Sequence, residues 1–455
     1  MDFAKDYSAI PPQVRELAQR SVENSQIDPS LYAEYNVKRG LRDRNGKGVL
    51  TGLTEISEVW GKQTVDGVDT EIDGILRYRG YNVEDLIGGF PKDNNFAYEE
   101  VIYLLLFGQL PTTEQFEEFK ALLAGYRNLP IHFVRDIIMK APSKDMMNTL
   151  ARSVLTLYSY DQNSDDNSPE NVLRQSLELI ALFPQLSIYG YHTYRYYHDG
   201  DSFFIHPPLE EYSTAENILH MLRMDSKFTS LEAKVLDMAL VLHAEHGGGN
   251  NSTFTTHVVT SSGTDTYSST AASLGSLKGP RHGGANIKCV RQMEELKQEV
   301  KDWKDDEEIA NYLNRLLNRD AFDKAGLIYG LGHAIYTKSD PRARMLKRFV
   351  RELSAEKGRT DEFELYESVE RIGPALVAAK RNTQKSICAN VDFYSGFAYS
   401  MLDLPLELYT PIFAIARISG WSAHRMEEII NRGKIIRPAY MNICPARDYV
   451  PFEER

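Results

Sequence analysis

Apolar side chains recur at helical spacing over most of the chain, and this periodicity restricts the possible fold more than any other feature of the sequence. Residues 309–317 show the pattern most clearly, as one apolar stripe formed by Ile309, Tyr312, Leu313, Leu316 and Leu317, with polar residues on the opposite side. A strand-rich composition at residues 75–81 predicts a short hairpin, and little else alternates over enough residues to form a strand. The sequence therefore predicts an all-α fold.

The ends of the predicted helices place polar side chains at defined points. Helical spacing runs from Leu231 to His246, and the glycines at 247–249 then stop the helix, which puts His246 at its end. Asp340 and Pro341 are typical of a capping residue and a first helical position, so Arg342 is expected in the first turn. A further helix is predicted from residue 286 onward.

A break at residues 278–286 separates two kinds of segment along the chain. After it, charged stretches alternate with amphipathic helices, and the composition turns apolar again at residues 390–413. We therefore predict a large helical domain formed by residues 1–287 and 389–455, and a smaller helical domain, residues 288–388, inserted into it. The Asp-, Asn- and Ser-rich residues 161–169 are predicted to form a solvated loop.

Composition excludes several classes of protein. The 52 Lys and Arg against 64 Asp and Glu give a net charge of −12, so no nucleic-acid footprint is expected and an anionic ligand must be held by a local basic cluster. The three cysteines form neither a disulfide framework nor a CxxC pair. Residues 1–42 lack a signal-length apolar run, and Asp2 and Asp6 disfavour a transit peptide. We expect a cytoplasmic protein that does not bind a membrane.

Three segments set a histidine among glycines, and glycine lets the backbone approach a ligand closely: residues 243–249 (HAEHGGG), 279–284 (GPRHGG) and 330–333 (GLGH). Any one of these histidines could instead be a turn residue or a satisfied core group. The helix predicted after His282 disfavours its imidazolium form, so a neutral donor suited to an oxyanion is expected there, unless His282 only caps the helix.

Two further residues are candidates for chemistry. Asp392 lies among apolar and aromatic residues, where burial would raise its pKa and make it a base able to take a proton from carbon; it could equally be a helix N-cap. Arg417 lies in an almost wholly apolar segment, so it needs a partner, either a bound carboxylate or a buried Asp or Glu.

Taken as a set, these segments resemble the citrate synthase family. The motifs that carry the resemblance are residues 242–250 (LHAEHGGGN), 278–286 (KGPRHGGAN), 330–334 (GLGHA), 340–342 (DPR) and 390–396 (NVDFYSG), together with the earlier 76–81 (LRYRGY) and 99–108 (EEVIYLLLFG). Their order matches as well, with nine residues from His333 to Arg342 and twenty from Arg417 to Arg437. The likeness covers roughly residues 45–440.

The resemblance implies a role for each matching residue. Asp392 would remove a methyl proton from acetyl-CoA, His282 would stabilise the enol oxygen, and His333 would protonate the oxaloacetate carbonyl. His246, Arg342 and Arg417 would hold the oxaloacetate carboxylates, with Arg437 supplied by the partner subunit of a homodimer. The backbone of Ile328, Tyr329, Gly330, Leu331 and Gly332 would contact the adenine of coenzyme A. Lys338 and Lys385 would reach its phosphates, although Thr337 stands where many bacterial relatives have a basic residue.

The resemblance implies no cofactor beyond the co-substrate acetyl-CoA, and no metal. It leaves 2-methylcitrate synthase, acting on propionyl-CoA, as an alternative within the family, because one methylene in an apolar pocket separates substrates by only about 1–3 kcal/mol. A metal-dependent hydrolase would use His243, His246 and His257 as ligands, but no HExxH glutamate accompanies them. A protein that only binds ligands would be expected to lack some of the catalytic side chains, and all of them are present.

Overall fold

The computed structural model describes residues 8–43, 47–89 and 96–455, which fall into two compact units, residues 1–53 and 54–455. Asp2 and Asp6, on which the prediction about targeting depends, lie outside the described residues. The first unit contains helices α1 (Pro12–Asn24) and α2 (Pro29–Glu34) and the 3-10 turn η1 (Arg39–Leu41).

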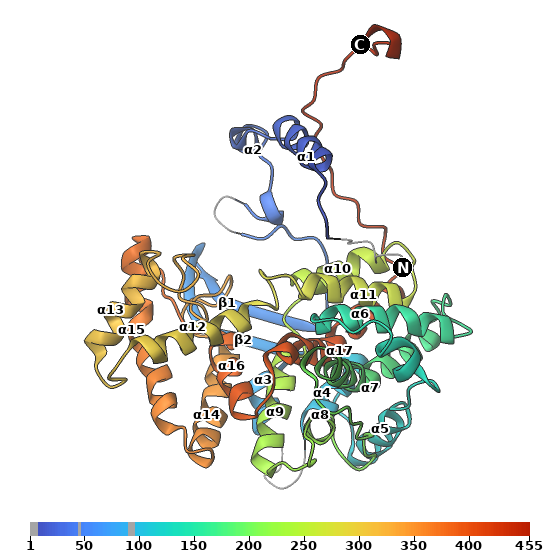
Figure 1. Cartoon of the computed structure of the whole chain (residues 1–455), viewed down its shortest axis with the longest axis vertical. Helices are drawn as coiled ribbons and strands as arrows, with labels where there is room; N and C mark the ends of the chain where they lie inside the picture. Colours follow the sequence, from blue (N-terminus) through green and yellow to red (C-terminus); the bar gives the residue numbers. More distant parts are fainter. Residues whose placement is uncertain (1–7, 44–46, 90–95) are drawn as a thin grey trace. The chain divides into compact units, whose positions relative to one another are not determined.

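The second unit is mostly helical, as predicted (Figure 1). Its sheet has strands β1 (Ser57–Val65), β2 (Val68–Tyr78) and β3 (Tyr81–Asn82). Its first helices are α3 (Val83–Gly88), α4 (Tyr98–Phe107), α5 (Thr113–Gly125), α6 (Met146–Leu157), α7 (Pro169–Tyr194), α8 (Thr214–Leu222) and α9 (Ser230–His243). The later helices are α10 (Asn251–Thr260), α11 (Thr266–Leu277), α12 (Ala285–Glu299), α13 (Asp306–Leu317), α14 (Pro341–Glu356), α15 (Thr360–Arg381), α16 (Val391–Met401) and α17 (Tyr409–Ile430). Short turns η2 (Val134–Ile138), η3 (Tyr158–Tyr160), η4 (Arg195–Asp199), η5 (Leu406–Leu408) and η6 (Phe452–Glu454) complete it.

The hairpin extends beyond the predicted residues 75–81. Strands β1 and β2 pair antiparallel from Ser57 with Tyr78, and the turn between them places Asp66 and Gly67 at φ 51° and 79°. Two consecutive residues with positive φ are typical of a type I′ turn, for which Asp-Gly is a favoured sequence. Strand β1 was missed because its side chains are mostly exposed, which leaves little apolar alternation to detect.

The helix predictions are confirmed with one shift in a boundary. The predicted stripe from Ile309 to Leu317 is the buried face of α13, and Asp340 caps α14, with Pro341 at its first position and Arg342 in its first turn. Helix α9 ends at His243, before the predicted His246, and Gly247 after it has φ 88°. His246 therefore lies in a turn that follows the helix.

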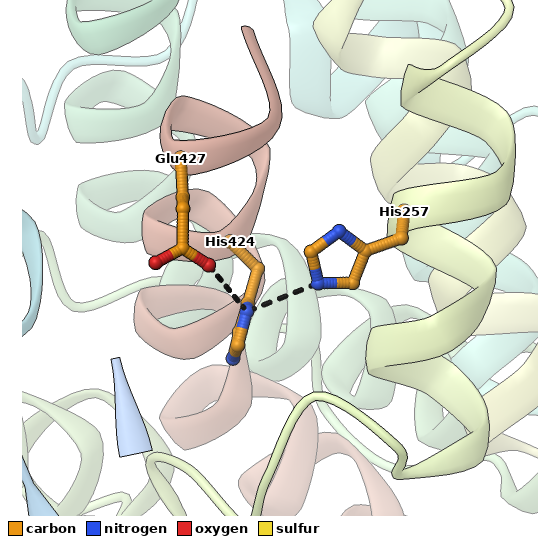
Figure 2. A group of neighbouring side chains, drawn as sticks. All are labelled: His257, His424 and Glu427. Atoms are coloured by element: carbon orange, nitrogen blue, oxygen red, sulfur yellow. Dashed lines mark hydrogen bonds and ion pairs between the residues drawn. The ribbon is translucent and has the colours of Figure 1, made fainter. Parts of the chain in front are cut away.

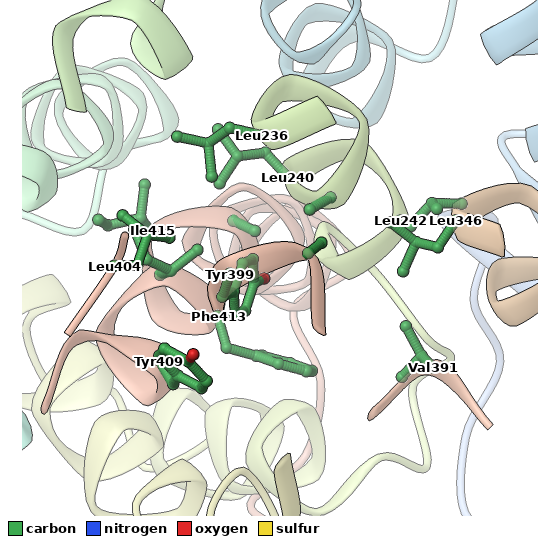
Figure 3. Packing of buried hydrophobic residues seen from close by; sticks show 14 of the residues in the cluster. Leu236, Leu240, Leu242, Leu346, Val391, Tyr399, Leu404, Tyr409, Phe413 and Ile415 are labelled. Carbon is green, nitrogen blue, oxygen red and sulfur yellow. The ribbon is translucent and has the colours of Figure 1, made fainter. Parts of the chain in front are cut away.

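Helix α17 forms the centre of the core. Every side chain from Tyr409 to Arg425 is buried, and α17 contacts α4, α7, α9, α10 and α11. Figure 3 shows Leu236 and Leu240 of α9 in the same core as Tyr399 of α16 and Ile415 of α17. A polar residue in α17 is consequently shielded from water and must find a partner inside the protein or in a ligand.

Helices α12 to α16 gather at one side of this unit, away from α5 to α8 (Figure 1). They contact one another, and α14 and α16 also contact α9. The inserted domain of residues 288–388 stays a prediction. Among the described residues, every helix is too short or too polar to span a lipid bilayer.

Candidate active site

The turn after α9 is held by hydrogen bonds to the hairpin. The Tyr78 hydroxyl, on β2, donates to the carbonyl oxygens of Val241 at 2.9 Å and Glu245 at 3.1 Å, and the Gly247 N–H donates to the Ser57 hydroxyl at 3.0 Å. The positive φ of Gly247 lets the chain reverse here. His246 is thereby fixed in the interior, 7% exposed, and its Nε2 has no hydrogen-bond partner.

Three predicted histidines share one electrostatic environment. Burial, followed by the charge of Arg342, lowers the pKa of His246 well below its ordinary value, and His333, Arg417 and His282 act in the same direction. The His246 and His333 rings lie edge to face with centroids 5.2 Å apart. Buried imidazoles beside arginines are uncharged at neutral pH, so they can donate hydrogen bonds but cannot act as cations.

The tautomer of His333 follows from its backbone neighbours. Its Nδ1 accepts from the N–H groups of Ile335 and Tyr336, both at 3.1 Å, so the proton of the neutral ring is on Nε2. Burial, then Arg342, lowers the pKa of His333 to about 4. His333 is thus a neutral ring whose Nε2–H is available as a donor.

His282 contacts a hydroxyl through Nε2. The Ser252 Oγ lies 3.0 Å from this nitrogen and also accepts from Trp421 Nε1 at 3.2 Å. Burial, then Arg417, lowers the pKa of His282 to about 4. The predicted neutral state of His282 is therefore confirmed, but its main cause is burial; α12 begins at Ala285, three residues later.

Asp392 lies in the first turn of α16, whose N-cap is Asn390: the Asn390 side chain accepts from the Asp392 N–H at 3.0 Å. The alternative that Asp392 is itself the N-cap is therefore wrong. Burial raises its pKa to about 6, although Arg342 opposes this shift. A carboxyl with such a pKa is mostly ionised at neutral pH and is a stronger base than an exposed aspartate.

Two buried arginines of α17 differ in how they are satisfied. Arg425 hydrogen-bonds through all three guanidinium nitrogens, to side chains of Thr260, Thr266 and Asn167 among others. Arg417, 0% exposed, donates only from Nε, to the His243 carbonyl at 2.6 Å, while its two Nη atoms are buried without a partner. A buried guanidinium with two free Nη atoms is suited to bind a carboxylate.

Arg342 is also buried, but it already has an acidic partner. Its Nε and Nη2 donate to the Asp340 carboxylate at 3.0 and 2.8 Å. Burial lowers the pKa of Arg342, but the charge and hydrogen bonds of Asp340, together with the charges of Tyr336 and Asp392, exceed this effect and raise it. Arg342 thus brings a fixed positive charge close to His246, His333 and Asp392.

The predicted coenzyme A loop packs against the residues that lead into α16. The Asn390 N–H donates to the Gly330 carbonyl at 2.8 Å, and the Gly332 N–H donates to the Cys388 carbonyl at 2.7 Å. Ile328 and Leu331 are buried, and Tyr329 donates its hydroxyl proton to Asp323. The loop is consequently attached to the segment that leads to Asp392.

The predicted basic residues lie on the surface. Lys338 is exposed and pairs with Asp73 at 3.1 Å, and Lys385 is exposed. Arg437, also exposed, follows the end of α17. The roles proposed for these three side chains stay predictions.

Residues 257, 424 and 427 form the one group in the described ranges whose His and Glu atoms approach closely enough to hold a metal ion. The hydrolase alternative required His243, His246 and His257 together, and this set is not assembled: the His243 ring instead stacks on Phe413 at 4.3 Å.

Sequence reasoning also missed Glu245 and His424. Both side chains are 0% exposed, and they form an ion pair at 3.3 Å. Their signal was available, because Glu245 stands between two singled-out histidines, and His424 lies two helical turns after Arg417.

Comparison with known proteins gives consistent matches. Residues 43–439 match the family model described as citrate synthase, C-terminal domain. The chain is 34% identical to a citrate synthase of Synechocystis sp., over 86% of this chain and 90% of the relative, and 33% identical to a 2-methylcitrate synthase of Shewanella oneidensis, over 89% and 98%. A solved ternary complex of carboxymethyl coenzyme A and oxaloacetate with the citrate synthase of Thermoplasma acidophilum aligns with a TM-score of 0.75 at 27% identity, covering 92% of this chain and 99% of that one.

Proposed function

The chain belongs to the citrate synthase family, whose members are transferases that condense acetyl-CoA with oxaloacetate, and we propose that Asp392, His282 and His333 perform this condensation here. The observation that carries the proposal is the partnerless pair of Nη atoms on Arg417, because it offers a carboxylate site beside neutral imidazoles.

The chemistry begins at the thioester. The Asp392 carboxylate takes a proton from the methyl carbon, and the electrons of that C–H bond form the double bond of an enolate, whose oxygen accepts a hydrogen bond from His282. The Ser252 hydroxyl has two acceptors within reach, Asn250 Oδ1 at 2.9 Å and His282 Nε2 at 3.0 Å; when it donates to His282, the ring carries its own proton on Nδ1 and donates there. This hydrogen bond stabilises the negative charge that passes from Asp392 to the thioester oxygen.

The enol carbon then attacks the ketone carbon of oxaloacetate. The ketone oxygen gains the proton of His333 Nε2–H, the tautomer set by the Ile335 and Tyr336 N–H groups. The proton that Asp392 took from the methyl group then replaces it, so both the ring and the carboxylate return to their starting states. Water subsequently cleaves the thioester of the citryl intermediate, which releases citrate and coenzyme A. Arg417, Arg342 and His246 bind the oxaloacetate carboxylates during both steps.

The remaining parts of the proposal concern assembly and the coenzyme. We place the adenine on the backbone of residues 328–332 and its phosphates near Lys338 and Lys385. Arg437 completes the site of a partner subunit in a homodimer, and residues 288–388 form the small domain that closes over the substrates. The activity belongs to the tricarboxylic acid cycle in the cytoplasm, and no metal takes part.

A thiol-release assay tests the function directly. Purified protein is mixed with oxaloacetate and either acetyl-CoA or propionyl-CoA, and kcat/KM is compared for the two. A preference for acetyl-CoA is the expected result. A preference for propionyl-CoA would move the chain to 2-methylcitrate synthase, an activity carried by relatives of similar identity. No thiol release with either thioester would refute the proposal.

A further inference from the structure

His424 and Glu245 form a buried ion pair that takes no part in the proposed condensation. His424 Nε2 lies 3.3 Å from Glu245 Oε1, and both side chains are 0% exposed. Glu245 Oε1 also accepts from the Ser57 hydroxyl at 3.0 Å, which in turn accepts from the Gly247 N–H at 3.0 Å. The pair is therefore connected to the backbone turn that carries His246.

The other nitrogen of His424 is also occupied. His424 Nδ1 lies 3.1 Å from His257 Nε2 (Figure 2). His257 Nδ1 in turn lies 2.9 Å from the Glu428 carboxylate. Since a carboxylate accepts, the His257 proton is on Nδ1 and its Nε2 must accept the Nδ1–H of His424. Glu427, 3.7 Å from the same nitrogen, adds a third negative group. His424 thus donates from Nδ1 to His257 and contacts the Glu245 carboxylate through Nε2, an arrangement that suits a protonated ring.

Glu245 lies between His424 and Arg417 along α17. A Cβ built on Gly420, three residues after Arg417 and four before His424, would lie 2.2 Å from Glu245 Oε2. This oxygen has no hydrogen-bond partner, and neither do the Nη atoms of Arg417. The charges already interact, because Glu245 opposes the lowering of the Arg417 pKa that burial causes. Without His424, the Glu245 carboxylate would therefore pair with the guanidinium of Arg417 instead.

We propose that His424 is a positioning residue for oxaloacetate: it binds Glu245 and so keeps the Nη atoms of Arg417 free for the substrate carboxylate. The proposal rests on the proposed role of Arg417. Although burial opposes it, the neighbouring Glu245 raises the pKa of His424 to about 9, which agrees with a charged ring across the neutral range.

The test compares His424→Gln with the double variant His424→Gln/Glu245→Gln. His424→Gln is expected to raise the KM for oxaloacetate about 10- to 100-fold, the loss of one charge-assisted hydrogen bond, with little change in kcat. The second substitution removes the competing carboxylate, so the double variant should recover a KM close to that of the parent. A merely structural role for His424 predicts the opposite, namely a double variant at least as impaired as the single one.

Glu428→Gln is the matched control for Glu245→Gln, because it removes one carboxylate charge from the same network but leaves Glu245 paired with His424. Its KM should equal that of the parent. If His424→Gln does not fold, the double variant still tests the proposal, because the proposal requires the double variant to bind oxaloacetate with the KM of the parent. An unchanged KM in His424→Gln, an unrecovered double variant, or a stoichiometric metal in the purified protein would each overturn the proposal. Thiol release by the parent enzyme is measured first, so that failure of the proposed function is recognised separately.

Discussion

Replacing Asp392 with asparagine is expected to stabilise the fold while it lowers turnover. Burial raises the pKa of Asp392 from 3.8 to about 6, so the ionised carboxylate is less favourable in the folded protein than in the unfolded chain. A difference of about two pH units corresponds to about 3 kcal/mol. Because the folded state holds the proton more tightly, this cost is absent below about pH 4, grows between pH 4 and 6, and is complete above pH 6. Asparagine does not ionise and avoids the cost.

The measurement is the denaturation midpoint of parent and variant at pH 7.5 and at pH 4. The variant should be more stable at pH 7.5, and the gain should disappear at pH 4. Turnover should fall by roughly 10²–10⁴-fold, the usual contribution of a positioned general base. Asp161→Asn is the control: although burial opposes it, hydrogen bonds from Gln175 and from Arg174, at 2.6 Å, lower the pKa of Asp161 to about 2, so its replacement should destabilise the fold at pH 7.5.

Two results would refute this reasoning. A variant less stable than the parent at pH 7.5, or one whose gain does not depend on pH, would show that burial of the carboxylate is not costly. Near-normal turnover would remove Asp392 as the base. For the parent, kcat/KM should fall tenfold per pH unit below about pH 6, because Asp392 becomes protonated there. His282 and His333 should not contribute to this fall, since their pKa values of about 4 keep them neutral at pH 6.

Four other substitutions, one of them a control, separate binding, proton placement and backbone geometry. Arg417→Leu should abolish oxaloacetate binding in calorimetry while the protein stays folded, whereas Arg425→Leu should lower the melting temperature, because it leaves several buried polar groups unpaired. Ser252→Ala should lower kcat about tenfold, because the His282 proton is then no longer fixed on Nδ1, while oxaloacetate affinity is retained. An unchanged kcat would contradict this role of Ser252. Gly330→Ala should raise the KM for acetyl-CoA and cost about 1–3 kcal/mol, since φ is 83° and a Cβ would meet a neighbouring side chain at 2.7 Å; a parent-like variant in both measurements would refute it.

The helices could be predicted because burial itself produces the signal. The stripe of α13 is apolar at the positions that pack, and Asp340 and Pro341 start α14 through local chemistry that needs no tertiary information. Strand β1 lacked such a signal, because most of its side chains are exposed and its pairing is specified by the turn at Asp66 and Gly67.

The charge states of the candidate site residues could be expected from the sequence, but the physical causes of these states could not. The glycine-flanked histidines and Asp392 have the predicted neutral and basic character, yet burial outweighs the helix terminus in setting the state of His282. The fraction of a side chain that becomes buried depends on the packing of elements far apart in the sequence. A local pattern can therefore indicate which residue is functional before it indicates what adjusts its pKa.

Arg417 and Arg425 show where sequence reasoning ends. The sequence predicts that Arg417 needs a partner without saying which kind, and it gives no such signal for Arg425 in the same helix. The partners of Arg425 are Asn167 and residues 260–266, from the end of α10 to the start of α11, all more than 150 residues away, and only the folded chain brings them to its guanidinium. Among the described residues no group hydrogen-bonds to the Nη atoms of Arg417, and Glu245, whose charge acts on Arg417, is paired with His424. The difference between a structural arginine and one proposed to bind substrate is thus a property of what the fold places around each, and we base the proposal for Arg417 on the partner it lacks.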